Sequence, residues 1–490
     1  MDLQQPPPVP GTASDSRLSA ATGSTDAAVR LGALLALRHN GAAEVAKFVD
    51  DSDPAIRAEA ARAIHDGEID AAAPALAAVL TKPAANDPVV AWRALNAGRM
   101  LGQPEHALAI AEFARDSSRP IGSRIEAIEI LEEWGSPHGQ DRVGGNWRPC
   151  EHPDAEAAVA SLGPLLPELL SGNGRVATTA ARACATLQLE EAIPALILLA
   201  NASHRPVDAR TAALRALDKL NAEEIDSVVA KITAEDPVQL RKAAVEIFAR
   251  RDPAKAAPVL ATLCERAVLP ERQSAFKALG ELNDPAAVPI LLQWLDNLEQ
   301  GQVDLTVQLD LLEAANKRQE PEIKERLEAW SAKQDKDDVL AQHQICLEGG
   351  NRQAGRRIFM ENEQTRCTRC HSVGGNGGSA GPVLDGIGNR HARSYLLESL
   401  VMPDKAIAEG FATTVVELHS GDLIAGVISK DQDGVLEIMT AEGESKKIAW
   451  DRISSRRQSK ASAMPSMAGT LTKRQIRDLI AYLASLRKNQ

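Results

Sequence analysis

The chain has 490 residues, of which 44% are hydrophobic, 3% aromatic and 25% charged, and its formal net charge is −12. The apolar content is sufficient to bury a large core, which excludes wholesale disorder, and the negative charge argues against a general nucleic-acid binder. The charge is uneven, because residues 350–490 carry 20 Lys and Arg against 15 Asp and Glu, which leaves 35 against 52 for the remainder. An acidic body joined to a basic C-terminal part indicates two different roles.

The N-terminal segment, residues 1–27, is rich in Pro, Ser, Thr and Ala, and we expect a flexible lead-in. It has neither the basic region nor the apolar region of a signal peptide. No run approaches the ~20 consecutive apolar residues of a membrane-spanning helix, so no transmembrane segment is expected.

Residues 28–295 repeat themselves. Five of the recurring alanines follow an Arg by three residues, and the full set is Ala60, Ala94, Ala127, Ala180, Ala213, Ala244 and Ala275. Asp-Pro pairs at Asp53, Asp87 and Asp236 predict helix starts, because Asp caps a helix and Pro suits its first position. A second apolar run follows in each unit, which predicts pairs of helices. The pattern resembles the HEAT-repeat family, which implies an α-solenoid that serves as a scaffold and binds a partner along its repeated face.

One step between the alanines is 53 residues long, because the chain carries a loop insertion at about residues 134–155. His138, Cys150 and His152 in this loop could ligate a metal, but no fourth ligand is evident. We expect instead a loop that its two Trp residues hold against the repeats.

Residues 296–349 are expected to form a helical connector, with helices at about 303–317 and 322–333. The Gly349-Gly350 pair then offers a hinge. Three cysteines lie among apolar helical residues, where buried and inert thiols are expected: Cys184, Cys264 and Cys346.

Cys367-Thr368-Arg369-Cys370-His371 is a C-x-x-C-H motif, which is typical of c-type heme attachment. Two thiols one helical turn apart can each add to one heme vinyl group, and the adjoining imidazole can bind the iron. A zinc site is disfavoured, because zinc takes four ligands and His391 is the one further candidate nearby. A thioredoxin-like redox pair is disfavoured, because the βαβ context is missing. The motif therefore predicts one covalently attached heme c.

Helices are predicted on both sides of this motif. Gly355 lies in a short helix before it and permits close helix contact, and Thr472 and Gln475 form a capping box that opens a final amphipathic helix. Two such helices pack together in class I cytochromes c, and this part of the chain resembles that family. The resemblance implies that Pro382 packs against the proximal heme face and that its carbonyl orients His371.

The sixth iron ligand is expected downstream, and the candidates are Met402, Met439, Met464 and Met467. Met464 stands in a Ser/Ala/Gly-rich loop just before the final helix, where cytochromes c place their axial Met. It is the expected distal ligand, with Met467 as the alternative. Met402 lies in a predicted helix-end turn and Met439 in a predicted strand.

Residues 411–453 alternate like antiparallel strands and are separated by turns at 420–422, 433–434 and 442–444. We expect a small β-meander inserted into a heme domain of residues 350–490, as either a heme cover or a docking surface. The expected fold is mainly α: a HEAT-like α-solenoid followed by a cytochrome c helical domain that carries a small antiparallel β insertion.

Residues 355–486 further resemble the heme-binding domain of the Pirellula/Verrucomicrobium (planctomycete) type. The resemblance rests on the C-x-x-C-H motif and on residues 373–378, Gly381-Pro382, 395–401, 405–407, Met464-Pro465 and 478–483. Family members usually read Met-Pro-x-Gly where this chain has Met464-Pro465-Ser466-Met467, so the choice of ligand stays open. In such proteins the domain often follows HEAT-like repeats and a propeller that resembles sugar or alcohol dehydrogenases.

These features predict an electron carrier and not an enzyme, because a His/Met-ligated iron favours electron transfer over substrate binding. The acidic repeats would hold a redox partner protein, such as a periplasmic dehydrogenase. Two alternatives are the electron-acceptor portion of a larger sugar or alcohol dehydrogenase, and a HEAT interaction scaffold with a non-functional heme site. A diheme peroxidase would need a second C-x-x-C-H motif. Covalent heme c is attached outside the bacterial cytoplasm, which predicts a periplasmic or otherwise exported protein although no signal peptide is visible.

Basic residues surround the motif, where they would orient docking, pair with heme propionates or form a solvated face. They are Arg356, Arg357, Arg366, Arg369, Arg390 and Arg393.

Overall fold

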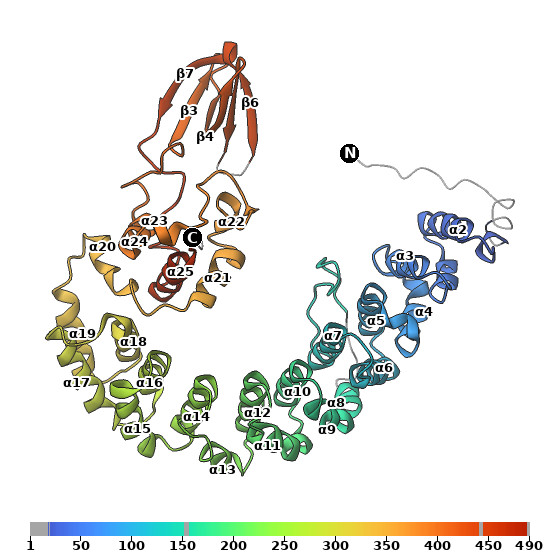
Figure 1. Cartoon of the computed structure of the whole chain (residues 1–490), viewed down its shortest axis with the longest axis horizontal. Helices are drawn as coiled ribbons and strands as arrows, with labels where there is room; N and C mark the ends of the chain where they lie inside the picture. Colours follow the sequence, from blue (N-terminus) through green and yellow to red (C-terminus); the bar gives the residue numbers. More distant parts are fainter. Residues whose placement is uncertain (1–17, 19, 151–155, 441–443, 488–490) are drawn as a thin grey trace. The chain divides into compact units, whose positions relative to one another are not determined.

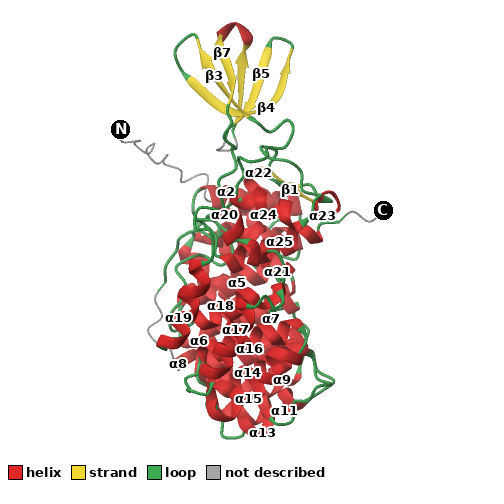
Figure 2. Cartoon of the chain, turned by 90° about the vertical axis from the view of Figure 1, so that its left-hand side faces the viewer, coloured by secondary structure: helices red, strands yellow, loops and turns green. Residues whose placement is uncertain are grey.

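A computed structural model gives the fold of the chain and describes residues 18, 20–150, 156–440 and 444–487 (Figure 1). The chain divides into two compact units, residues 1–248 and residues 249–490. Helices dominate, and the longer strands gather in one small sheet (Figure 2). Among the described residues, no helix is both long enough and apolar enough to cross a membrane.

The first unit is a double layer of short helices. Helices of the first layer contact one another in chain order. They are α2 (Ala27–His39), α3 (Pro54–His65), α5 (Pro88–Leu101), α7 (Ile121–Glu132), α10 (Gly174–Thr186) and α12 (Val207–Lys219). The second layer holds α4 (Ala73–Ala77), α6 (Pro104–Arg115), α8 (Glu156–Leu162), α9 (Leu166–Ser171), α11 (Ile193–Asn201) and α13 (Ile225–Val229). Short 3-10 turns join them: η1 (Ala43–Phe48), η2 (Asp70–Ala72), η3 (Ala78–Thr81), η4 (Pro83–Asn86), η5 (Gly163–Leu165) and η6 (Glu190–Ala192). This is the α-solenoid that the repeats predict.

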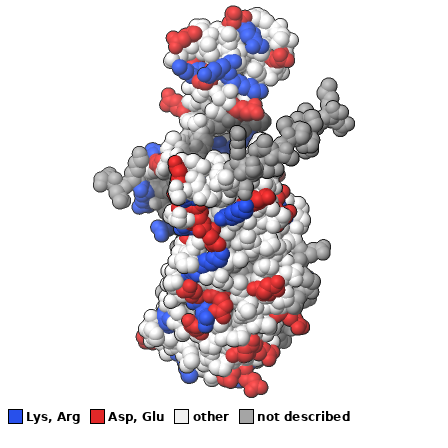
Figure 3. All heavy atoms as spheres, turned by 90° about the vertical axis from the view of Figure 1, so that its right-hand side faces the viewer, with Lys and Arg blue, Asp and Glu red and all other residues white. Residues whose placement is uncertain are grey.

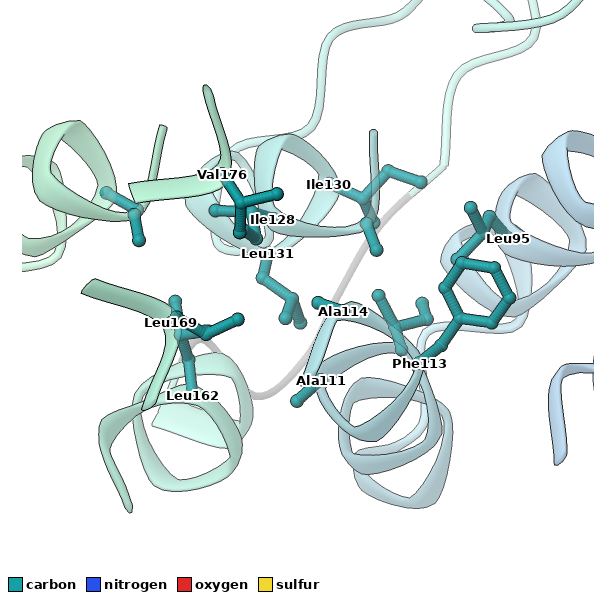
Figure 4. Close-up of a cluster of buried hydrophobic side chains, with 14 of the residues drawn as sticks. Leu95, Ala111, Phe113, Ala114, Ile128, Ile130, Leu131, Leu162, Leu169 and Val176 are labelled. Atoms are coloured by element: carbon teal, nitrogen blue, oxygen red, sulfur yellow. The ribbon is translucent and has the colours of Figure 1, made fainter. Parts of the chain in front are cut away.

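The recurring alanines mark where neighbouring helices meet. All seven are buried and six have no exposed surface, and each lies in a different helix of the repeat series. Larger apolar side chains fill the space between the two layers, as Figure 4 shows around Leu131 of α7 and Ala114 of α6. The predicted helix starts are confirmed at Asp53 and Asp87, whose carboxylates accept the backbone N–H two residues on.

Three of the recurring arginines bind the C-terminal end of the helix that precedes them. In three repeats the Arg Nε donates to a backbone carbonyl in the last turn of the preceding helix, where carbonyls lack partners within the helix. The bonds run from Arg124 to Ala114, from Arg210 to Ala200 and from Arg272 to Cys264, at 2.7, 3.0 and 2.8 Å. In these repeats the Arg therefore joins two successive helices, and the Ala three residues later is buried where its helix meets a neighbouring one.

The loop inserted after α7 is described as far as Cys150. Trp134 is fully buried, but Trp147 is 72% exposed, so the prediction that both Trp residues hold the loop down is right for the first and wrong for the second. The loop folds instead into a small hairpin in which Gln140 and Trp147 form an antiparallel bridge. Polar contacts through Asp141 hold this hairpin on the repeats.

The Asp141 carboxylate is buried, with 2% of its side chain exposed. Its Oδ2 accepts from Asn96 Nδ2 at 2.6 Å and lies 3.0 Å from His65 Nε2, both on helices of the first layer. Its Oδ1 accepts the backbone N–H groups of Val143 and Gly144 at 2.9 and 2.5 Å. Burial raises the pKa of Asp141, but these donors and the charge of His65 outweigh it, so the pKa lies below its ordinary value.

Asp141→Ala should therefore destabilise the first unit. We expect the free energy of unfolding to fall by ~3 kcal/mol, because a buried charged partner is removed from His65 and Asn96. Denaturant unfolding followed by Trp fluorescence measures the loss. Since the folded pKa is lowered, the Asp141 contribution is complete above the unfolded pKa of ~3.9 and is lost as the pH falls through the folded pKa. The matched control is Asp70→Ala, because the side chain of Asp70 is 84% exposed and pairs with Arg148 of the same loop; an equal loss there would contradict the assignment.

The second unit continues the helical repeats. After α14 (Val238–Arg251), which crosses the boundary between the units, the helices are α15 (Pro253–Arg266), α16 (Leu269–Glu281), α17 (Ala287–Glu299), α18 (Leu305–Asn316) and α19 (Pro321–Ala332). The helices predicted at 303–317 and 322–333 are thus found within two residues of their expected bounds as α18 and α19. Helix α18 packs on α16 and α19 packs on α17, as in the preceding repeats, so the repeat packing extends beyond residue 295, where the connector was expected to begin. A short connector follows, with α20 (Val339–Gln342) and η7 (Gln344–Cys346).

The remaining helices belong to the C-terminal part of this unit. They are α21 (Arg352–Glu361), α22 (Cys367–Cys370), α23 (Ile387–Arg390), α24 (Arg393–Val401) and α25 (Lys473–Ser485). The predicted contact between first and last helix is present, because a Cβ on Gly355 would lie 1.9 Å from the Asp478 carbonyl oxygen. The rings of Phe359 and Tyr482 meet across this contact with centroids 5.6 Å apart. The capping box of Thr472 also forms as predicted.

The β insertion is a five-stranded antiparallel sheet with the strand order β6-β5-β4-β3-β7. Its strands are β3 (Thr413–Leu418), β4 (Leu423–Gln432), β5 (Val435–Met439), β6 (Ser445–Ala449) and β7 (Ile453–Gln458), and η8 (Trp450–Arg452) joins the last two. The prediction of a meander ending at residue 453 missed β7, which pairs with β3 and not with its neighbour in sequence. Val416, Leu436 and Ile438 have no exposed surface and form the core of the sheet.

Candidate heme site

The two motif cysteines lie at the ends of the single helical turn α22. The turn follows Arg366, whose backbone is left-handed with φ of 43°, and it ends where the His371 N–H donates to the Cys367 carbonyl at 2.9 Å. Both thiols are partly buried, and burial raises the pKa of Cys367 and of Cys370. The two sulfur-bearing residues and the imidazole are therefore presented together by one short segment.

His371 is held by the proline that sequence analysis singled out. Its Nδ1 donates to the Pro382 carbonyl oxygen at 2.9 Å. Because a carbonyl only accepts, the proton is on Nδ1 and the lone pair is on Nε2. Burial lowers the pKa of His371, with the Pro382 carbonyl opposing in part, so the ring is neutral at pH 7. A neutral imidazole fixed through its second nitrogen is the usual state of a metal-binding histidine.

Glycines let the loop after the motif fold back onto it. A Cβ on Gly378 would lie 1.9 Å from the Arg369 carbonyl oxygen. A Cβ on Gly381 would lie 2.8 Å from Cε1 and 2.9 Å from Nδ1 of His371. Before these glycines, the short strands β1 (Ser372–Val373) and β2 (Asn376–Gly377) pair as an antiparallel hairpin. The imidazole is thus seated directly against the backbone.

A cavity with a volume of about 510 Å³ opens beside the motif, and Cys367, Cys370, His371 and Pro382 all line it. This volume is within the range of ligand and cofactor sites, roughly 300–1,000 Å³. Apolar side chains from several helices complete the wall: Phe359, Ile387, Leu396, Leu400, Leu479 and Leu483. A mainly apolar cavity that places two thiols and a neutral imidazole on its wall fits heme c.

Three of the four candidate methionines also line this cavity: Met439, Met464 and Met467. Met402 is not among the described lining residues. Met464 is partly exposed, whereas Met467 is 4% exposed and its N–H donates to the Leu400 carbonyl at 2.8 Å. The loop that carries both residues is therefore anchored to the end of α24.

The inserted sheet contributes part of the cavity wall, which sequence analysis left open. Its lining residues come from the start of β3, the middle of β4 and the end of β5: Thr413, Ala425, Gly426, Val427, Met439 and Thr440. These strands are neighbours in the sheet, so one end of the sheet faces the cavity. This placement favours the cover over a role in docking alone.

His391 and Tyr395 line the cavity as a stacked pair with ring centroids 3.9 Å apart. From the sequence, His391 was a candidate only as a zinc ligand, and Tyr395 entered only as part of the family resemblance at residues 395–401. The one feature of the sequence that could have predicted this pair is the spacing of four positions between the two aromatic rings.

The basic residues around the motif differ in their surroundings. Arg356, Arg357, Arg366, Arg369 and Arg390 are exposed, and Arg366 and Arg390 line the cavity. Arg393 has a structural role, because it donates to the Leu347 carbonyl at 2.8 Å and pairs with Glu348. Figure 3 shows one face of the molecule, on which Lys and Arg lie interspersed with Asp and Glu.

The other candidate ligands, in the loop after α7, do not form a metal site among the described residues, where no group of three or more His, Cys, Asp or Glu is arranged to hold an ion. His138 accepts the Gln140 N–H at 3.3 Å, and Cys150 lies 3.1 Å from Arg99 Nη1. His152 lies outside the described residues. The three remaining cysteines, in α10, α15 and η7, are fully buried as expected.

Two solved structures show what the chain resembles. One is the complex of CpcE and CpcF of phycocyanin lyase from Nostoc sp., with a TM-score of 0.28, 16% identity and coverage of 67% of this chain and 98% of that chain. The other is human deoxyhypusine hydroxylase in complex with glycerol, with a TM-score of 0.22, 18% identity and coverage of 62% and 94%. Neither likeness is close enough to support a function.

The comparison with curated proteins found no match. Two family models match parts of the chain: HEAT repeats at residues 225–303 and Cytochrome c at residues 353–417. The second range contains the C-x-x-C-H motif and Pro382, and it ends within β3. The chain thus combines HEAT repeats with a cytochrome c domain, which implies covalently bound heme c.

Proposed function

We propose that the chain is a monoheme c-type cytochrome that transfers single electrons, with its HEAT-like repeats acting as a scaffold for a redox partner. One observation carries the proposal: His371, fixed by the Pro382 carbonyl, lines the same cavity as Cys367 and Cys370. When bound, heme c supplies a one-electron iron couple. Cys367 and Cys370 would hold it through their thiols, His371 would bind its iron through Nε2, and the apolar wall would exclude water.

Electrons would enter and leave near the exposed surface beside the proximal residues. Val383, directly after Pro382, is 56% exposed, and exposed Arg366 and Arg390 flank the same cavity. A partner that docks on this surface would lie beside the cavity that would hold the heme. We propose a periplasmic dehydrogenase as the donor and an exported location for the chain, since heme c is attached outside the cytoplasm. No catalytic role is proposed.

The finer family assignment is also a proposal. We propose a heme-binding domain of the Pirellula/Verrucomicrobium (planctomycete) type, on the residues given above. One alternative is the electron-acceptor portion of a larger sugar or alcohol dehydrogenase. The other is a HEAT scaffold whose heme site is non-functional. A pyridine hemochrome spectrum of the chain expressed with heme-maturation machinery separates the carrier from this last alternative, since an empty site would give no covalently bound heme after denaturation.

Met464 is proposed as the distal ligand because it lines the cavity while only partly buried, so its sulfur is not needed to fill a core. Met464→Ala should abolish the Met–iron charge-transfer absorption of the oxidised protein and lower its reduction potential. The matched variant Met467→Ala should keep the absorption and destabilise the fold by ~2–5 kcal/mol, as loss of a buried Met does. The reverse pattern would assign the iron ligand to Met467.

A further inference from the structure

Helix α25 of the cytochrome domain is joined to repeat helix α18 by a buried ion pair. Arg477 is one of the largest fully buried side chains, and its Nη1 and Nη2 donate to the Asp310 carboxylate at 2.7 and 3.3 Å. Asp310 is 1% exposed and also accepts from Arg474 at 2.8 Å. Arg477 Nε has no hydrogen-bond partner among the described residues. Asp310 is therefore the carboxylate on which the buried guanidinium depends.

The backbone at Gly349 and Gly350 is packed tightly against α18 and α25. A Cβ on Gly349 would lie 2.1 Å from the Thr306 carbonyl oxygen, and one on Gly350 would lie 2.3 Å from that of Arg477. Gln273 Nε2 of α16 donates to the Gly349 carbonyl at 2.7 Å. The pair of glycines that sequence analysis interpreted as a hinge is instead clamped between α18 and α25.

Other residues of α25 form the wall of the heme cavity. Leu479 and Leu483 line it, and Tyr482 packs against Phe359, which lines it from α21. Asp478 accepts the Asn351 N–H at 2.7 Å and so ties α25 to the start of α21. The position of α25 thus fixes both the apolar wall and the helix that leads into the heme motif.

We propose that Asp310, a residue of the repeats, is a positioning residue of the heme site. Resting on the proposed electron-carrier function, this means that the repeat array is part of the heme pocket and not only a platform beside it. Asp310 sets the depth and rotation of α25 through Arg477, and α25 in turn sets the wall around the heme. A shift of α18, for example when a partner docks on the repeats, would then change the heme environment through this pair.

The test uses the full heme-loaded chain. Asp310→Asn keeps the shape of the side chain but leaves Arg477 without its counter-charge. We expect amide exchange in residues 473–485 to accelerate by about 100-fold or more, the Met–iron absorption to weaken and the midpoint potential to shift. The double variant Asp310→Leu with Arg477→Leu should restore all three, because no unpaired charge remains buried. The control is Glu299→Gln, which breaks an exposed repeat ion pair with Lys333 and should change none of them.

Two outcomes would overturn the proposal. In the first, Asp310→Asn leaves the absorption and the potential as in the unmodified chain, even if exchange in α25 accelerates, which would make Asp310 a residue of the fold alone. In the second, the double variant is as impaired as the single one. If the unmodified chain carries no heme, the proposed electron-carrier function is refuted. The hemochrome spectrum measures this independently of the Asp310 variants.

Discussion

We expect a chain that carries both Cys367→Ala and Cys370→Ala to retain no covalently attached heme. The two cysteines stand at the two ends of the single turn α22, three positions apart in the chain. Their thiols therefore lie on one face of that turn and could reach the two vinyl groups of one heme. A thioether bond to the heme would survive denaturation of the chain. The non-covalent contacts of the cavity would not hold the heme once the chain unfolds. Heme staining of a denaturing gel and the pyridine hemochrome spectrum both measure the loss, which should be complete.

The control for this variant exchanges two cysteines that play no part in the site. Cys184 and Cys264 are fully buried in repeat helices, and burial raises the pKa of the Cys184 thiol to about 12. Cys184→Ala with Cys264→Ala should therefore keep the full heme content, since neither thiol reacts in the folded chain. Heme retained by the first variant would mean that the C-x-x-C-H motif is not the point of attachment.

Gly381→Ala should separate heme attachment from iron ligation. The added methyl would lie 2.8 Å from the His371 ring, so either the imidazole or the loop that carries Pro382 must move. The hydrogen bond from His371 to the Pro382 carbonyl cannot survive either movement unchanged. We expect the heme to remain attached while the His–iron bond weakens, the visible spectrum changes towards a high-spin form and the fold loses ~1–3 kcal/mol.

Gly469→Ala is the matched control, because a Cβ on Gly469 would meet no atom within 4 Å. It lies in the same domain, directly after the loop of the candidate methionines. Absorption spectroscopy and thermal unfolding of the two variants give the comparison. Identical spectra for Gly381→Ala and the unmodified chain would show that His371 does not depend on this contact.

Local signals in the sequence predicted much of this fold. The recurring alanines, the Asp-Pro helix starts and the Thr472 capping box each depend on residues close together in the chain, and the structure places them as expected. The C-x-x-C-H motif likewise brings its three side chains together without help from distant residues. Such features need only the geometry of one helix or one turn.

The features that sequence analysis missed depend on distant partners. Strand β7 has one partly buried residue followed by five exposed ones, so it shows no alternation, and its pairing with β3 comes from the topology of the sheet. The exposure of Trp147 follows from a hairpin that Asp141 anchors on His65 and Asn96. The Arg477–Asp310 pair joins residues that are 167 positions apart. No pattern among residues close together in the sequence predicts these contacts.

The wall of the cavity has a consequence for the order in which the protein matures. Its lining runs from Phe359 in α21 to Leu483 in α25, so it closes only when α25 has emerged and docked. Before that moment, we expect Cys367 and Cys370 to be more accessible than in the folded chain, where both are partly buried. Afterwards, burial raises the pKa of both thiols and makes the reactive thiolates scarce. If heme c is attached as proposed, we therefore expect attachment to precede closure by α25, because the thiols react less readily once they are buried.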